Sequence, residues 1–592
     1  MMRWNRLRVR NISIGLGIIG LVSVVLGACG GGDATPTPTA APATATPTRA
    51  APTATSAPAT ATPLPTATPA PTPTPAAQVA VATPVINTQG KRGGVLQLST
   101  LPGYMDFYDS LSAGGKAGLH IYFPLLNSLL WPDPYGTGLV GDVAERWEIS
   151  QDGKVITFYL RQGIKFHDGS PLTSQDVAYN IERGWKPRAP TMREMVAKLQ
   201  GLQQIETPDD RTVRLILSVR SNSFLASLGS VQMLMYPARI PFPERNDQWK
   251  QNPVGTGPFK VKTFQPGVRA EWVRNDAYWK QPLPYLDAVV TTAITHDLVP
   301  AAFRTGRLDA VSLEHSAIVD FVKTLEQATG FIKYPMMTGL YGLSLNRRPP
   351  LTDPRVREAI DLVTNRQDWI VTWAKGLGTP YAAPLLPPEF GGQWGIPVEA
   401  MKSRPGFQED KTADLARAKQ LLAQAGVDPA KTSLELIGTS TLDLLSQAQQ
   451  VAADLRNLGI TLKINLLEGA ARTQKRLTLD WDIDQFIAVP TLDDPLDYLV
   501  SWVHSQGAEN VAKWSNPTLD TLFAEQDTST DPAKRKALNL ELQETVLKDR
   551  FVIPVVWRLA WNGHQPWVKN FPGKVPFSFS PRWRWEQVWI ER

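Results

Sequence analysis

A segment that cannot fold divides this chain. From residue 33 to residue 85 the sequence is almost entirely Thr, Ala and Pro, and Asp33 and Arg49 are its only charged residues. Such a composition cannot bury a hydrophobic core, and its prolines favour an extended, semi-rigid conformation that rises ~3.1 Å per residue. We therefore expect a tether here, and a folded region that begins near Lys91 and runs to Arg592.

The residues before the tether have the features of an export signal. A basic start that ends at Arg10 precedes an uncharged stretch over residues 12–28, which is shorter than the ~20 residues of a membrane span and typical of a signal peptide. The stretch ends Leu26-Gly27-Ala28-Cys29, which is similar to a bacterial lipobox, whose Cys is lipidated and becomes the new N-terminus. An uncleaved membrane anchor with a buried Cys is the alternative.

These segments predict the location of the protein. We expect a lipoprotein signal peptide over 1–28, a lipid-anchored tether over 29–90, and Cys29 as the lipid anchor. The protein would then be an extracytoplasmic, membrane-anchored lipoprotein, in the periplasm or on the outer face of the cell membrane. Because Cys29 is the only Cys, a disulfide within one chain is impossible.

Length and charge limit the function classes. A chain of 592 residues should divide into more than one lobe, because single cores stop growing near ~250–300 residues. The net charge is +6, and much of it comes from the four arginines before residue 11. This balance argues against a nucleic-acid partner, which requires a dense basic face.

Local signals predict strands, a capped helix and a hairpin in the first part of the folded region. Thr173 with Asp176 forms a capping box for a helix over 174–183, and Pro208-Asp209-Asp210 is a turn sequence between two strands. The expected strands are 93–98, 155–160, 205–206 and 212–217.

The second part alternates helices with strands. Asp353-Pro354 is an N-cap and N1 pair that opens a helix over 355–364, and Gly426 closes a helix over 413–425. Such alternation predicts βαβ units and a largely parallel sheet, hence an α/β lobe. The later elements are expected as strand 434–437, helix 442–458 and strands 460–467 and 482–489.

Seven motifs in order carry a resemblance to a known family. The chain resembles the family 5 solute-binding proteins of bacterial ABC importers, which bind oligopeptides, dipeptides, nickel complexes, opines or oligosaccharides. The resemblance implies an α/β, two-lobed, periplasmic-binding-protein-like clamp (type II, cluster C) with an extra domain inserted in the first lobe. The motifs are GGVL at 93–96, LVGDVAERW at 139–147, GIKFHDGSPLTSQD at 163–176, PVGTGPF at 253–259, TDPRVREAI at 352–360, DLARAKQLLAQAG at 414–426 and Asp494-Pro495.

The resemblance also implies domain boundaries. Two crossings between the lobes, near 344–346 and 549–554, would form a hinge. Lobe one is expected over 91–135, 256–345 and 546–592, its inserted domain over 136–255, and lobe two over 346–545.

Enzyme signatures give no support to a catalytic reading. The sequence contains no P-loop, HExxH or GxSxG pattern, and no His is spaced with carboxylates as a metal site requires. We expect no catalytic residue, no metal and no cofactor. We interpret His167-Asp168-Gly169 as a turn rather than half of a triad, and Asp482 and Asp484 as solvated charges at a strand end rather than a glycosidase pair.

The candidate ligand-binding residues lie in loops expected to face the cleft. In the peptide-binding members that the chain resembles, an Asp four positions before the loop Pro pairs with the peptide amino group, and that position is Thr491 here. Asp493 could take the role after a shift of two residues. The full candidate set is Tyr104, Trp185, Trp394, Val489, Thr491, Asp493 and Trp502.

We interpret the chain as an extracytoplasmic solute-binding lipoprotein. It would capture a small solute, foremost a peptide, between two lobes and deliver it to the permease subunits of an ABC transporter, as a monomer held to the membrane by its lipid. Two alternatives stay open: an oligosaccharide-binding member of the same family, and a surface-tethered glycoside hydrolase or adhesin.

Overall fold

The computed structural model describes most of the chain after the tether. Cys29 and almost all of the Thr/Ala/Pro segment lie outside the described residues. Those residues are 77–78, 86–102, 105, 119–132, 139–186, 199, 201–230, 232–240, 249, 253–295, 297–313, 332–439, 442–490, 493–572 and 584–592.

The first sheet after the tether has four strands. Its order is β2-β11-β10-β9, in which β2 runs parallel to β11 and the other pairs are antiparallel. Leu96, Phe259 and Trp272 of this sheet are buried in one hydrophobic cluster. The strands are β2 (Val95–Thr100), β9 (Phe259–Gln265), β10 (Arg269–Arg274) and β11 (Ala288–Ala293).

A five-stranded antiparallel sheet with one long helix forms the next unit. Its order is β1-β5-β6-β8-β7. Alternate residues of β6 point into a core that the helix α2 (Ser174–Trp185) covers. The predicted capping box is confirmed, since the Thr173 backbone N–H donates to the Asp176 carboxylate at 2.9 Å. The strands are β1 (Ala77–Gln78), β5 (Ala144–Ile149), β6 (Val155–Leu160), β7 (Leu202–Asp209) and β8 (Thr212–Leu217), and β7 with β8 makes the predicted hairpin.

The largest sheet has seven strands of mixed direction. Its order is β12-β18-β13-β17-β15-β16, and β14 pairs with β18 off this path. Only β15 with β16 and β15 with β17 are parallel, so the prediction of a largely parallel sheet is wrong for the half that contains β13 and β18. The strands are β12 (Ala310–Leu313), β13 (Ile332–Leu345), β14 (Gly378–Thr379), β15 (Ser433–Thr439), β16 (Thr461–Leu467), β17 (Ile483–Ala488) and β18 (Val552–His564).

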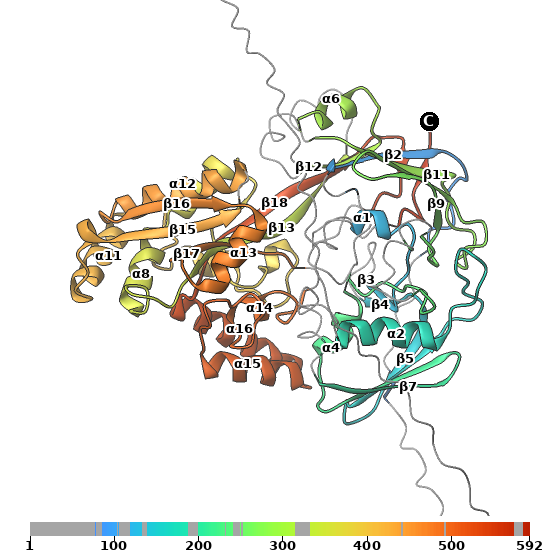
Figure 1. Ribbon diagram of the computed structural model, residues 1–592, viewed down its shortest axis with the longest axis horizontal. Coiled ribbons are helices and arrows are strands. Elements are labelled where there is room, and N and C mark those ends of the chain that lie inside the picture. The colour runs from blue at the N-terminus through green and yellow to red at the C-terminus, as the bar shows by residue number, and fades with distance from the viewer. Residues whose placement is uncertain are drawn as a thin grey trace, which may run out of the picture. The chain divides into compact units, whose positions relative to one another are not determined.

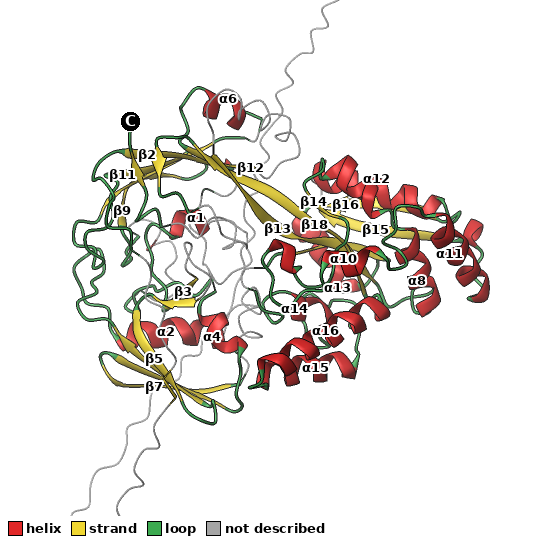
Figure 2. Ribbon diagram, turned by 180° about the vertical axis from the view of Figure 1, so that it is seen from behind, coloured by secondary structure: helices red, strands yellow, loops and turns green. Residues whose placement is uncertain are grey.

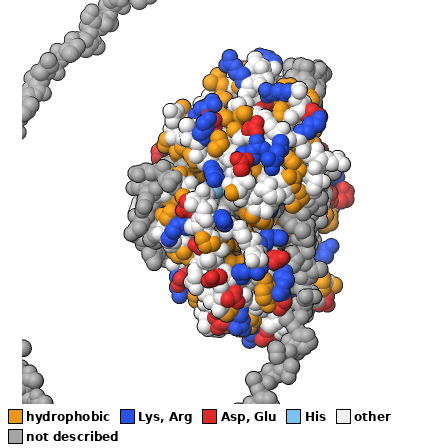
Figure 3. All heavy atoms as spheres, turned by 90° about the vertical axis from the view of Figure 1, so that its right-hand side faces the viewer, with side chains coloured by type: hydrophobic (Ala, Val, Ile, Leu, Met, Phe, Trp, Pro, Cys, Tyr) orange, Lys and Arg blue, Asp and Glu red, His pale blue; other side chains and the backbone are white. Residues whose placement is uncertain are grey.

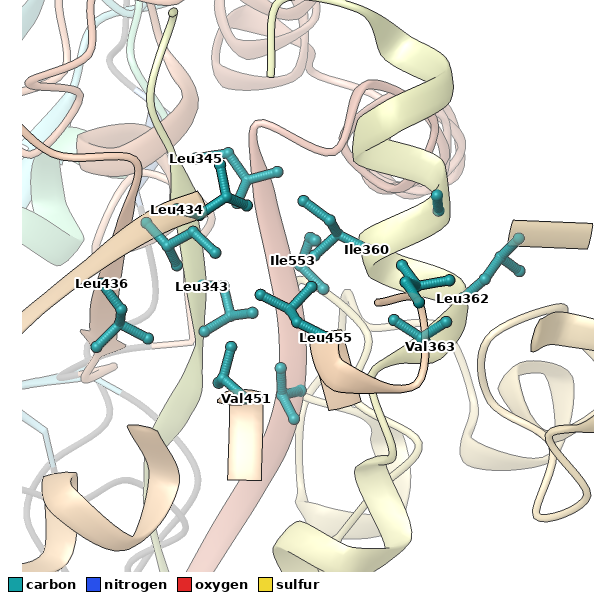
Figure 4. Close-up of a cluster of buried hydrophobic side chains, with 14 of the residues drawn as sticks. Leu343, Leu345, Ile360, Leu362, Val363, Leu434, Leu436, Val451, Leu455 and Ile553 are labelled. Atoms are coloured by element: carbon teal, nitrogen blue, oxygen red, sulfur yellow. The ribbon is translucent and has the colours of Figure 1, made fainter. Parts of the chain in front are cut away.

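Helices pack against both the parallel and the antiparallel part of this sheet. Leu343 of β13, Ile360 of α8, Leu455 of α12 and Ile553 of β18 meet in one buried cluster (Figure 4). The helices are α8 (Pro354–Val363), α11 (Thr412–Gln424), α12 (Leu442–Arg456), α13 (Gly469–Thr478), α14 (Leu499–Val503), α15 (Pro517–Thr528) and α16 (Pro532–Asp549). The predicted start of α8 is confirmed, because the Asp353 side chain accepts a hydrogen bond from the backbone N–H of Arg355.

Two long strands connect the parts of the molecule. β13 and β18 run antiparallel along most of their length (Figure 2). At one end β18 pairs with β12, through Leu313 opposite Trp561, and at the other β13 pairs with β17 from Leu340 onward. The crossings predicted near 344–346 and 549–554 therefore lie on the β17 side of Leu340, the residue from which β13 pairs with β17. A fold with two such crossing strands is two-lobed, and below we use "lobe two" for the described residues of 346–545.

Short elements complete the described part. They are α1 (Leu119–Tyr122), β3 (Leu130–Pro132), β4 (Leu139–Gly141), α4 (Ser223–Leu228), α6 (Val299–Arg304), α9 (Arg366–Asp368), η4 (Trp369–Trp373), η5 (Pro388–Phe390), α10 (Val398–Lys402), η6 (Pro429–Lys431), β19 (Val568–Lys569) and β20 (Trp589–Ile590). None of the helices in the described residues has both the length and the apolar character that crossing a bilayer requires.

Candidate functional site

The loop after β17 contains Asp493, the one predicted site residue with a carboxyl group. The Asp493 carboxylate accepts a hydrogen bond of 2.6 Å from the backbone N–H of Gln393, and its carbonyl accepts one of 2.9 Å from the Trp394 indole. Burial raises the pKa of Asp493 to about 7, and the neighbouring Asp494 adds to the rise although the Gln393 N–H opposes it. Asp493 is thus a carboxyl group that changes charge near neutral pH.

A buried ion pair fixes the same loop. Asp494 accepts a hydrogen bond of 2.8 Å from the guanidinium of Arg535 on α16, and one of 2.9 Å from the backbone N–H of Leu496. The guanidinium of Arg535 lies 4.5 Å from the ring centroid of Trp394. Arg535 therefore holds both the Asp493–Asp494 loop and the aromatic residue that covers it.

Two of the predicted residues pack against one hydrophobic cluster of lobe two, and a third, Val489, follows a strand of the same sheet. Trp394 and Trp502 are half-buried against this cluster, whose members include Phe486 of β17, and the rings of Phe486 and Trp502 lie 4.9 Å apart. Half-buried Val489 follows β17, next to Gly339 of β13. Together with Asp493, these side chains offer apolar walls and one titratable carboxyl group.

The other predicted residues do not join this group in the described structure. Trp185 packs against the core of the five-stranded sheet, with the ammonium of Lys186 4.4 Å from its ring centroid. Tyr104, Thr491 and Cys29 lie outside the described residues. Arg535 was missed by the sequence reasoning, because a single Arg in a charged helix gives no signal of the Trp394 and Asp494 that it contacts.

The prediction that Asp482 and Asp484 are solvated is wrong. The Asp484 carboxylate is fully buried and lies 2.7 Å from Arg472 and 3.0 Å from Arg476. Asp482 is also buried and accepts a hydrogen bond of 2.8 Å from the backbone N–H of Glu435. Both residues sit within a sheet that α13 covers, and their cations come from that helix and from Arg348. Their role here is in the fold.

A buried charge network lies under the GDVAERW motif. The Asp142 carboxylate is fully buried and contacts Arg584 at 2.6 Å and Lys280 at 3.1 Å. Burial alone would raise the pKa of Asp142, but Arg584 and Lys280 hold it well below its usual range. Asn127 and Ser128 donate further hydrogen bonds to this carboxylate. The motif residue thus joins the C-terminal segment to the start of the folded region.

The PVGTGPF and HDG motifs meet at one turn. Imidazole Nε2 of His167 lies 3.1 Å from the carbonyl of Gly257, and its Nδ1 accepts from the backbone N–H of Gly255. Burial lowers the pKa of His167 to about 4, so the ring is neutral and Nε2 donates. A Cβ atom on Gly255 would lie 1.9 Å from the carbonyl oxygen of Leu125. The reading of 167–169 as a turn is confirmed by the hydrogen bond from the Gly169 N–H to the Phe166 carbonyl.

Charges are mixed on the surface that Figure 3 draws. Basic and acidic side chains alternate there with apolar ones. Among the described residues, no group of three or more His, Cys, Asp or Glu side chains is placed to hold a metal ion.

The fold and the loop site define a class, the two-lobed α/β binding proteins. The profile of the bacterial extracellular solute-binding proteins, family 5 (middle region), matches residues 138–510. The chain belongs to this family, whose members bind solutes rather than transform them.

Individual relatives agree with this assignment. The periplasmic oligopeptide-binding protein OppA of Escherichia coli (strain K12) is 27% identical over 485 residues, which cover 77% of this chain and 85% of OppA. The binding protein AgaA of A. tumefaciens R10, solved with agropinic acid, is similar in structure with a TM-score of 0.70 at 24% identity, over 84% of this chain and 99% of AgaA. DppA of Helicobacter pylori, solved with the peptide STSA, gives a TM-score of 0.70 at 24% identity, over 85% of this chain and 99% of DppA.

Proposed function

We propose that this chain captures peptides between its two lobes and delivers them to the permease of an ABC importer. The observation that carries the proposal is the relation to OppA, a protein named for oligopeptide binding, over 77% of this chain. Asp493 supports it, because a half-buried carboxyl group beside Trp394 can pair with a peptide amine when ionised. The half-buried aromatic side chains of Trp394 and Trp502 can cover peptide side chains of differing size.

The proposal includes anchoring and the predicted division into domains. The lipobox-like sequence that ends at Cys29 supports a lipid anchor, and the Thr/Ala/Pro segment would then hold the folded region away from the membrane. We place the inserted domain at 136–255 within lobe one, because this range contains α2 and four strands of the five-stranded sheet, β5 to β8, and most of the core that they share.

The test begins with the purified full-length chain. Native mass spectrometry should reveal a co-purified peptide, and calorimetry should show binding of trialanine or a longer alanine peptide but not of maltotriose. The bound peptide should be recovered chemically unchanged. Binding of the sugar alone would replace the peptide assignment, and release of a cleaved product would overturn the non-enzymatic one.

Closure gives a second readout of the same proposal. A saturating peptide should make the protein more compact in small-angle scattering, since closed lobes make contacts that open lobes cannot. Scattering that stays the same at saturation would exclude capture by closure.

A further inference from the structure

The start of α4 is held against the end of α15, about 300 residues away in the sequence. The backbone N–H of Asn222 donates to the carbonyl of Asp527 at 2.8 Å, and its side chain donates to the carbonyl of Ser529 at 2.6 Å. The backbone N–H of Ser223 donates to the Asp527 carboxylate at 2.7 Å. Both ribbon views place α4 beside α15 (Figure 1, Figure 2). By the predicted boundaries, this contact joins the inserted domain to lobe two.

The same serine reaches the loop of the candidate site. The Ser223 hydroxyl donates to one oxygen of Asp494 at 2.7 Å, while Arg535 donates to the other oxygen at 2.8 Å. Arg535 also donates to the side-chain oxygen of Gln526 at the end of α15. Ser223 and Asp494 are buried, and Gln526 is fully buried. The hydrogen bonds of these polar groups are therefore made within the protein and not to water. Asp494 directly follows Asp493.

We propose that Asn222, Ser223, Asp494 and Asp527 form a clasp that stabilises the closed arrangement of the lobes and so raises solute affinity without touching the solute. The inference rests on the proposed capture between lobes. Opening about β13 and β18 would separate α4 from α15, so the hydrogen bonds of the clasp exist only when the lobes meet. A solute that needs the closed form binds with an apparent affinity scaled by the closed fraction.

The variant that tests the clasp is Ser223→Ala, with Ser227→Ala as its matched control. Ser227 lies on the same helix and is also buried, but its hydroxyl donates to the carbonyl of Ser223 within α4. In the full-length chain with Cys29→Ser, spin labels would be attached at two exposed positions, Lys154 and Lys536. Pulsed electron–electron double resonance then measures the distances between the two spin labels with no peptide added.

We expect a short and a long distance in the parent protein. Ser223→Ala should reduce the ratio of short to long populations about tenfold, the effect of one hydrogen bond to a charged acceptor, and Asp527→Ala should act in the same direction. Ser227→Ala should leave the ratio unchanged. A parent with the long distance alone, an unchanged ratio in Ser223→Ala, or an equal loss in Ser227→Ala would each overturn the clasp.

Adding a mixture of alanine peptides of three to five residues separates the two proposals. If the peptides shift the parent toward the short distance, their affinity for Ser223→Ala should fall in proportion to its closed fraction. If they shift nothing, the peptide function fails, whereas the clasp is still decided by the comparison without peptide.

Discussion

Loss of the Asp142 charge should destabilise the fold more than loss of a surface charge. Asp142→Asn keeps the shape of the side chain but leaves Arg584, whose side chain is 2% exposed, and Lys280, which is 6% exposed, without their shared carboxylate. Breaking a buried pair by removing one partner costs about 3–5 kcal/mol. Lys280 keeps Glu586 at 3.1 Å, so we expect a value near the lower end of that range.

Urea unfolding of the full-length chain, followed by circular dichroism, measures this cost. The control is Asp168→Asn, which removes an ion pair with Arg239 whose partners are both 41% exposed, and such pairs contribute only about 0–1 kcal/mol. A surface ion pair contributes at most about 1 kcal/mol. If the free energy of unfolding of Asp142→Asn lies within about 1 kcal/mol of that of Asp168→Asn, the reasoning is refuted.

The pH dependence supplies an independent check. Because the pKa of Asp142 is depressed in the folded protein, its charge contributes stability that is fully present above the unfolded pKa of about 3.9 and is lost as pH falls below it. The stability gap between the wild type and Asp142→Asn should therefore be constant near neutral pH and narrow below about pH 4. A gap that stays constant into acid would contradict the assignment.

Three further predictions concern packing, binding and anchoring. Gly255→Ala should cost at least about 2 kcal/mol in urea unfolding, because its Cβ would lie 1.9 Å from a backbone carbonyl, whereas Gly469→Ala, with no atom near its Cβ, should be close to neutral. Since the pKa of Asp493 is about 7, the affinity for trialanine relative to its N-acetylated form, measured by calorimetry, should rise about 20-fold from about pH 5.5 to about pH 7.5. Thr491→Asp should raise this affinity ratio at both pH values, and a ratio that does not change with pH would exclude an amine at Asp493. Cys29→Ser should abolish incorporation of labelled fatty acid and leave the protein either released or retained only through an uncleaved signal. A wild type that takes up no label would disprove the lipid anchor.

Elements with a local cause were predictable from the sequence. The capping box of Thr173 with Asp176 and the Asp353-Pro354 start of α8 each act within a few residues, and both are present. The partners of a strand are not local. β13 and β18 arrive from outside the βαβ region and pair antiparallel beside β17, so alternation of helices and strands described only the β15–β17 part of the sheet.

Buried charges were the other feature beyond sequence reasoning. A carboxylate at the start of a strand is normally solvated, but Asp484 is buried because Arg472 and Arg476 of α13 cover it. The carboxylate of Asp142 meets a cation 442 residues away. Only tertiary packing brings such partners together, and no spacing in the sequence records them.

The position of the family motifs explains why relatives with one fold can serve different solutes. Asp142, His167 and Gly255 join segments of the frame through buried contacts, and Asp494 is occupied by Arg535 and Ser223. These residues build the lobes and, in the proposed clasp, favour their closure. In the proposed site, the side chains that would meet a solute lie between them, at positions such as Asp493 and Trp502, so a change there would alter the solute while the fold remains. AgaA, solved with agropinic acid, and DppA, solved with a peptide, share one architecture. A separation of the residues that build the fold from the residues that would face the solute predicts such a pair.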